Sequence, residues 1–487
     1  MRRFKGARTW CVAIGIAIGV SGLLILLTVV VPSVVSIVPA AQLSSLTTGQ
    51  TASHTSTTSA STTVARTTTH QLACSPRTPF NPPLLATLAP PGDLVLDHTR
   101  HIVVIVSSSR NTRSTIDSIA TFDATTGASI GSKRAVTAPL AAHAPTVILS
   151  DGLYMALDER TQRVFVLHQP FAQGASPPSR VDVFDEHSLA LLRIVPVGNV
   201  ARPPVVDEQT GRVFVAGQQS GTVDVLDATT GAPLRRVAVA VAALLPSAPP
   251  VVVPGANRVF FAEDTAPGVV AVLDARSGAL LRKVVVGLYP QAIAVDPATG
   301  HVLVGSQNTV SVLDGRDGTA LHTAGVPGSP TGLLIDGTTQ RAFVSYADNF
   351  KVSMLDALTG RVLRSEIVRA DVDALGHLLP PNVRPPQQPG SEQPPTLSRI
   401  DERRRWVVVS NPEISDDDAP EPGSAQLATL DSRTGTIIHI VAAQNIWPDA
   451  AAVDERTGRA FVYGSSGITM YDISCLTSYY VFADLPQ

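Results

Sequence analysis

The sequence predicts an all-β fold made of repeated four-stranded units, and three observations predict it. The composition is typical of strands and turns, since the 487 residues include 38 Pro and 35 Gly and only 16% are charged. Valine-rich runs with two-residue alternation are separated by turn residues. A unit of four such runs recurs along the chain. Locally connected strands repeated in this way are the architecture of a β-propeller.

The repeat is clearest in residues 205–239 and 293–325, where each unit contains two turns that begin with an acid. The first-turn acids are Asp97, Asp158, Asp207, Asp296, Asp336, Asp401 and Asp454, and Gly255 takes this place in the fourth unit. The second-turn acids are Asp123, Asp185, Asp227, Asp274, Asp314, Asp356, Asp431 and Asp472. Asp caps a turn with its side chain, and a Gly four residues later supplies a positive φ. These acids are therefore expected to shape turns.

The repeat favours eight four-stranded blades, with seven as the alternative if the degenerate first unit is not a full blade. The eighth unit, residues 449–472, shows only three strands. Residues 84–88 are expected to supply the fourth and close the ring, because this pairs an otherwise open edge. The tail at residues 478–485 is a second candidate for that strand.

Asn308–Asp314 (NTVSVLD) shows the strand and turn of the unit clearly, and Val286–Pro290 and Gly325–Pro330 show the connector that follows it. In these segments the unit resembles the YVTN-type β-propeller repeat of surface and periplasmic proteins. The resemblance covers residues 84–474. It implies a propeller and export from the cytoplasm. It implies no particular activity, because one fold serves many functions.

The N-terminal part predicts export independently of the repeat. Residues 1–42 carry four cationic side chains before residue 9 and then a long uncharged apolar stretch. Val12–Val31 alone has the ~20 apolar residues that cross a bilayer, and the preceding cations keep the N-terminus inside. A cleaved signal peptide is the alternative, because residues 38–40 resemble a cleavage site. Both interpretations place the remainder outside the cytoplasm.

Two further parts follow the membrane segment. Residues 43–73 form a linker, in which 17 of the 26 residues from 44 to 69 are Ser or Thr, a composition typical of disorder. Residues 74–487 form the propeller. Cys74 and Cys475 lie near its two ends, and in an oxidising compartment they are expected to form a disulfide that locks the ring.

The spacing of the turn acids locates insertions in the repeat. First and second acids are 18 to 20 residues apart in units three, five, six and eight, but 26 to 30 apart in units one, two and seven. The inserted segments are residues 107–118, 140–150, 168–180, 371–396 and 411–425. In a four-stranded blade these connections all lie at one end of the sheet. Elaborated loops on one face of a rigid scaffold are typical of a binding surface.

The side chains expected on this face are three histidines and an acidic run. The candidate ligand-face residues are His143, His168, His377, Glu413, Asp416, Asp417 and Asp418. No spacing among the histidines indicates a metal site. The acidic run lacks the EF-hand pattern, so weak calcium binding is only an alternative to a solvated surface. No other cofactor is indicated.

The expected function is a membrane-anchored, extracytoplasmic binding or scaffold module with an unidentified protein or small-molecule ligand. A net charge of −3 gives no basic field for nucleic acid. The alternatives are a propeller enzyme, lactonase-like or quinoprotein-dehydrogenase-like, and a structural cell-envelope protein. The familiar hydrolase, zinc-protease and phosphate-loop motifs do not occur in the sequence. Catalysis is therefore left open, with a binding role favoured.

Overall fold

The structure is a computed structural model that describes residues 92–110, 114–139, 148–172, 179–198, 201–217, 220–239, 248–263, 265–347, 349–368, 395–411, 426–442, 446–464 and 467–472. The chain divides into two compact units, residues 1–71 and 72–487, and every described residue belongs to the second. The predicted membrane segment, the linker, both cysteines of the predicted disulfide and both candidates for the closing strand lie outside the described residues.

The described part of the chain consists of strands and turns, grouped into eight antiparallel sheets that we call blades 1 to 8. Blade 1 contains β1 (Gly92–Asp97), β2 (Ile102–Arg110), β3 (Ser114–Asp123) and β4 (Ser129–Pro139). Blade 2 contains β5 (Ile148–Asp158), β6 (Arg163–Ala172), β7 (Arg180–Asp185) and β8 (Leu191–Pro196). Blade 3 contains β9 (Val205–Asp207), β10 (Arg212–Gly217), β11 (Thr222–Asp227) and β12 (Pro233–Ala238). Blade 4 contains β13 (Val251–Val253), β14 (Arg258–Glu263), β15 (Gly268–Asp274) and β16 (Leu280–Val286).

The second half of the ring repeats this arrangement. Blade 5 contains β17 (Ala292–Val295), β18 (Val302–Ser306), β19 (Thr309–Leu313) and β20 (Ala320–Gly325). Blade 6 contains β21 (Pro330–Asp336), β22 (Arg341–Tyr346), β23 (Asn349–Asp356) and β24 (Val362–Ile367). Blade 7 contains β25 (Thr396–Asp401), β26 (Trp406–Asn411), β27 (Gln426–Asp431) and β28 (Ile437–Ala442). Blade 8 contains β29 (Ile446–Asp454), β30 (Arg459–Gly464) and β31 (Gly467–Asp472).

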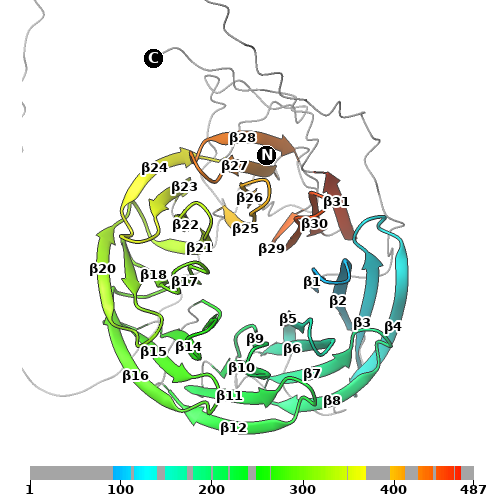
Figure 1. The fold of residues 1–487 in the computed structure, drawn as a ribbon. Helices are drawn as coiled ribbons and strands as arrows, with labels where there is room; N and C mark the ends of the chain where they lie inside the picture. Colours follow the sequence, from blue (N-terminus) through cyan, green and yellow to red (C-terminus); the bar gives the residue numbers. More distant parts are fainter. Residues whose placement is uncertain are drawn as a thin grey trace, which may run out of the picture. The chain divides into compact units, whose positions relative to one another are not determined.

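The blades form a ring in which the first strand of each sheet lies nearest the centre and the last strand lies outermost (Figure 1). The ring closes where β1 contacts β29, and apolar side chains of blades 1 and 8 share one buried cluster. The predicted all-β propeller is confirmed, with seven four-stranded blades. Blade 8 has three strands among the described residues, and its predicted fourth strand lies outside them.

The Asp-led turns have the predicted capping chemistry. Oδ1 of Asp97 accepts hydrogen bonds from the backbone N–H groups of Thr99 and Arg100, both at 2.8 Å. In the second turn of blade 3, Oδ1 of Asp227 accepts from the N–H of Thr230 at 2.9 Å. The backbone N–H of Ser188 holds the pKa of the Asp185 carboxyl below its ordinary value. These turn acids are structural, because they satisfy backbone donors that the strands leave open.

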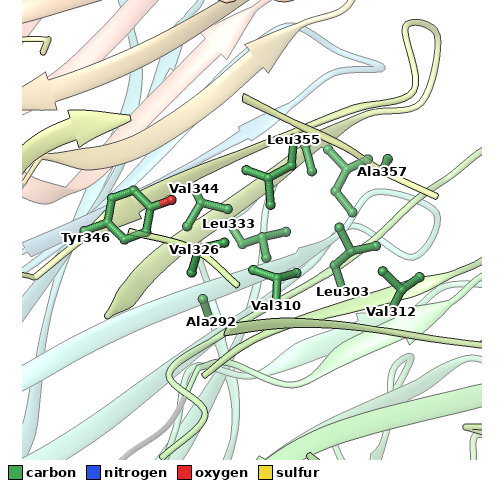
Figure 2. Close-up of a cluster of buried hydrophobic side chains, with 12 residues drawn as sticks. Ala292, Leu303, Val310, Val312, Val326, Leu333, Val344, Tyr346, Leu355 and Ala357 are labelled. Atoms are coloured by element: carbon green, nitrogen blue, oxygen red, sulfur yellow. The ribbon is translucent and has the colours of Figure 1, made fainter. Parts of the chain in front are cut away.

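Consecutive blades pack face to face across apolar interfaces that we call seams. Figure 2 shows the seam between blades 5 and 6, where Leu303, Val310 and Val312 of blade 5 meet Leu333, Val344, Tyr346 and Leu355 of blade 6. All these side chains are fully or almost fully buried. Burying such side chains is the main favourable term in the free energy of folding.

Arginines reinforce the seams along the outer strands. Nε of Arg193 in β8 donates to the carbonyl of Thr230 in the next blade at 3.0 Å, and Nη1 of Arg235 in β12 donates to the carbonyl of Ser277 at 3.1 Å. Arg282 in β16 likewise donates to the hydroxyl of Thr319 at 3.2 Å. Each arginine thus clamps the second turn of the following blade. Sequence reasoning missed this clamp, because an Arg on an outer strand looks like an ordinary solvated side chain.

Candidate binding face

The inserted segments all connect strands at the same end of their sheets. They lie between β2 and β3, β4 and β5, β6 and β7, β24 and β25, and β26 and β27. In a four-stranded antiparallel meander, these second-to-third and fourth-to-first connections share one end, and the Asp-led turns share the other. We call the first end the long-loop rim and the second the turn rim.

Two blades extend toward the long-loop rim with regular structure. The pairing of β2 with β3 continues to Arg110 and Thr115, and the pairing of β5 with β6 continues to Ile148 and Ala172. β2 to β6 are 9 to 11 residues long, whereas every described strand of blades 3 to 6 has 3 to 8 residues. We call this part of blades 1 and 2 the extended ladders. They are the largest regular departure from the repeat in the described structure.

The extended ladders correct the interpretation of two inserted segments as loops. Residues 107–110 and 114–118 are strand, residues 111–113 lie outside the described residues, and residues 168–172 continue β6. The physical reason is that a longer hairpin satisfies its backbone N–H and C=O groups within its own ladder. The acid-to-acid spacing detects the extra residues but does not show whether they extend strands or form a loop.

His168 does not lie in a loop of this rim, as the sequence suggested, but inside β6 with 4% of its surface exposed. Its Nε2 lies 3.2 Å from Oδ2 of Asp182, and Nε of Arg180 donates to Oδ1 of the same carboxylate at 3.1 Å. Asp182 is fully buried. A buried carboxylate needs such partners. This cluster lies where β7 begins, so His168 belongs to the support of the extended ladders rather than to an exposed ligand group.

Blade 3 carries an equivalent carboxylate at Asp224, also three residues before the second-turn acid. Nε of Arg236 donates to its Oδ1 at 2.6 Å, and the backbone N–H of Gly198 donates to its Oδ2 at 2.9 Å. Gly198 belongs to the connection from blade 2, so Asp224 ties two blades together near the long-loop rim. Sequence reasoning missed both acids, although an acid inside an apolar strand pattern is a signal that could have identified them.

The other predicted ligand-face residues, His143, His377, Glu413, Asp416, Asp417 and Asp418, lie outside the described residues, and so do Cys74 and Cys475. Within the described ranges, no three His, Cys, Asp or Glu side chains are grouped as metal ligands. No helix in the described part of the chain is long and apolar enough to span a bilayer.

The turn rim uses its carboxylates to brace neighbouring blades. The carboxylate of Glu159 accepts from the backbone N–H of His98 at 3.1 Å, and that of Glu208 accepts from the N–H of Glu159 at 3.0 Å. Burial, followed by the nearby charges of Asp158 and Glu159, raises the pKa of Glu208. Each glutamate thereby links its own blade to the preceding one. The acids of this rim therefore have a structural explanation.

The fold defines the chain as a β-propeller protein, and comparisons with known proteins agree with that class. A family model described as outer membrane protein assembly factor BamB matches residues 219–374, from blade 3 to blade 6. That family differs from the YVTN type, so the family model supports a propeller repeat but not that particular one. No curated protein matches the chain significantly.

Three solved structures illustrate the likeness. BamB from Moraxella catarrhalis is 14% identical, with 75% of this chain and 95% of that chain covered and a TM-score of 0.49. The dihydro-heme d1 dehydrogenase NirN in complex with DHE is 13% identical, with 82% and 78% covered and a TM-score of 0.46. The hydrazine synthase of Kuenenia stuttgartiensis is 13% identical, with 52% and 70% covered and a TM-score of 0.41. A shared propeller fold does not by itself imply a shared activity.

Proposed function

We propose that this protein is an extracytoplasmic binding or scaffold module, tethered to the membrane by its N-terminal segment, which binds a protein partner through the long-loop rim. The observation that carries the proposal is the pair of extended ladders in blades 1 and 2. Their added backbone pairs lie at the same end of the sheets as every other insertion. The described turns at the opposite end are short and repeat the same Asp capping.

Two further features support the proposal. Asp182 and Asp224 fix the base of the extended ladders and the neighbouring connection with buried, charge-assisted hydrogen bonds, which hold a surface in one geometry. The family model that matches blades 3 to 6 is that of an outer membrane protein assembly factor. An assembly role depends on protein contacts, and it agrees with the export that the N-terminal sequence predicts.

Photo-crosslinking in the native host tests the proposed binding face. A photoreactive amino acid at Thr115 of β3 or at Phe171 of β6 is expected to crosslink the full-length chain to a defined partner. The same amino acid at Thr229 or Arg276, both exposed on the turn rim, is the control. We expect the yield of crosslinked partner to be at least about tenfold higher from the ladder positions, because only a residue inside an interface stays within reach of the partner.

Two results would contradict this assignment. Equal yields from both rims would show that the long-loop rim is not a preferred interface. Crosslinks confined to Thr229 and Arg276 would place the partner on the turn rim, and the extended ladders would then need another explanation.

A further inference from the structure

The seam between blades 1 and 2 differs at a glycine position from the seams that blades 3, 4 and 5 form with the preceding blade. In blades 3, 4 and 5 the second turn has Gly231, Gly278 or Gly318, and a Cβ added there would lie 2.6 to 2.9 Å from a valine of the preceding blade. Blade 2 has Leu189 instead, with a positive φ of 53° and a buried side chain. A leucine therefore adopts the left-handed conformation that glycine adopts in those turns. Only a wider seam has room for this leucine.

Blade 1 also lacks the arginine clamp at this seam. Gly131 of β4 is in register with Thr121, at the position that Arg193, Arg235 and Arg282 occupy in blades 2 to 4. An added Cβ on Gly131 would lie 3.5 Å from Cδ1 of Leu189, so the leucine occupies space beside the missing side chain. The outer part of this seam is therefore not closed by a clamp from β4.

A second substitution in β4 leaves the seam open to solvent. Lys133 is in register with Ile119, at the position where blades 2, 3 and 4 have the buried valines Val195, Val237 and Val284. These valines fill their seams, whereas Lys133 is exposed. No described carboxylate forms a salt bridge with it. Blade 1 thus places an unpaired cation where blades 2, 3 and 4 have an apolar side chain.

The result is a cavity of about 210 Å³ between the two blades. Val106, Ile119, Phe184, Leu189 and Leu191 line it, and Lys133 lies at its exposed side. A dry apolar cavity of about 150 Å³ is already large enough to hold benzene. This cavity therefore has room for one aromatic ring with a short substituent.

We propose that this cavity is a binding site for a small carboxylate with an apolar body, such as an aryl-substituted short-chain acid. The apolar body fills the space between the blades, and the carboxylate pairs with the Lys133 ammonium. Gly131, Lys133 and Leu189 each differ from the residues at the equivalent positions of the following blades, and all three lie at this one seam. Because an empty apolar cavity forfeits packing contacts, a ligand that restores them binds favourably. The site is separate from the proposed partner interface, and either can exist without the other.

Calorimetric titration of the full-length chain with 3-phenylpropionate tests the site, with 3-phenylpropionamide as the neutral isostere. Saturable binding of the carboxylate is expected, and the amide is expected to bind about fivefold more weakly, as for the loss of one exposed ion pair. Lys133→Met should remove this difference. Lys351→Met, which removes an exposed lysine of blade 6, should leave it unchanged.

A second pair of variants tests the cavity itself. Ala190→Trp places an indole at the half-buried turn position that lines the cavity and should abolish binding of both probes. Ala232→Trp is the matched control at the equivalent, equally half-buried position of blade 3 and should bind like the wild type. Three results would overturn the proposal: no saturable binding of 3-phenylpropionate, equal binding of acid and amide by the wild type, or equal loss of binding in the two tryptophan variants.

Discussion

Replacing Glu186 with glutamine is expected to stabilise the folded protein by up to about 3 kcal/mol at pH 8 and to leave its stability unchanged below pH 4.5. Glu186 follows the second-turn acid of blade 2, at the position of the buried Ala124, Ala228 and Ala275 in other blades. It is 3% exposed. A carboxyl group therefore stands at a position that other blades fill with a methyl group.

The partners of Glu186 explain the direction of the effect. Nη1 of Arg100 lies 3.2 Å from its Oε2 and 2.9 Å from Oδ2 of Asp97, so two buried carboxyls share one guanidinium. Burial, the charge of Asp97 and a hydrogen bond with Asp97 together raise the pKa of Glu186 to about 7. The residue equivalent to Glu186 in blade 7 is Ser432, whose hydroxyl donates a hydrogen bond to Asp336 of blade 6. That seam therefore contains one acid at this place, whereas the seam between blades 1 and 2 contains two.

The sign of the pH dependence follows from that raised pKa. The fold favours the protonated form, so the stabilising contribution is fully present below the unfolded pKa of 4.5 and is lost as the pH rises to about 7. Glutamine keeps the shape and the neutral charge at every pH. Urea unfolding at pH 4.5 and pH 8 measures the difference. Glu159→Gln, which makes the same charge change on the turn rim, is expected to have a small effect, and equal effects of the two variants would refute the explanation.

Gly231→Ala is expected to destabilise the protein by about 3 kcal/mol. Gly231 has a φ of 66°, a conformation that disfavours a Cβ. The added Cβ would also lie 2.6 Å from Cγ2 of Val183 in blade 2, closer than packed atoms approach. The substitution therefore adds a steric conflict across a closely packed seam to the backbone cost.

Gly255→Ala separates these two contributions. Gly255 has a φ of 77°, but no heavy atom lies within 4 Å of its added Cβ. Its substitution should cost only the backbone term, about 1 kcal/mol. Thermal or urea unfolding of both variants provides the comparison. Similar losses in the two would show that the seam between blades 2 and 3 has room for the added methyl group, and would contradict the close packing inferred for it.

The repeat and its turns could be predicted because they depend on short-range patterns. Alternation predicts strands, and Asp227 with Gly231 predicts a turn whose hydrogen bonds the structure contains. The spacing between the turn acids also predicted which rim carries the insertions. The three strands of blade 8 could also be predicted, because they show the same short-range alternation.

The side chains that distinguish one seam from another could not be predicted in this way. Gly131 and Lys133 are unusual only because cross-strand register places them at the positions of an arginine and a valine in other blades. Register between strands depends on backbone pairing, which the spacing of turn acids does not determine. The burial of His168 beside Asp182 likewise depends on β6 continuing beyond its expected end.

Export of the propeller is the claim on which the account depends most, and cysteine labelling tests it most directly. Thr229→Cys places a thiol on an exposed turn of blade 3. In cells stripped of any outer layer but with an intact cytoplasmic membrane, a membrane-impermeant maleimide should label this variant as fully as after lysis, above the level of the wild-type chain. A cytoplasmic protein, which is labelled only after lysis, serves as the control. If the Thr229→Cys variant is also labelled only after lysis, export of the propeller is contradicted.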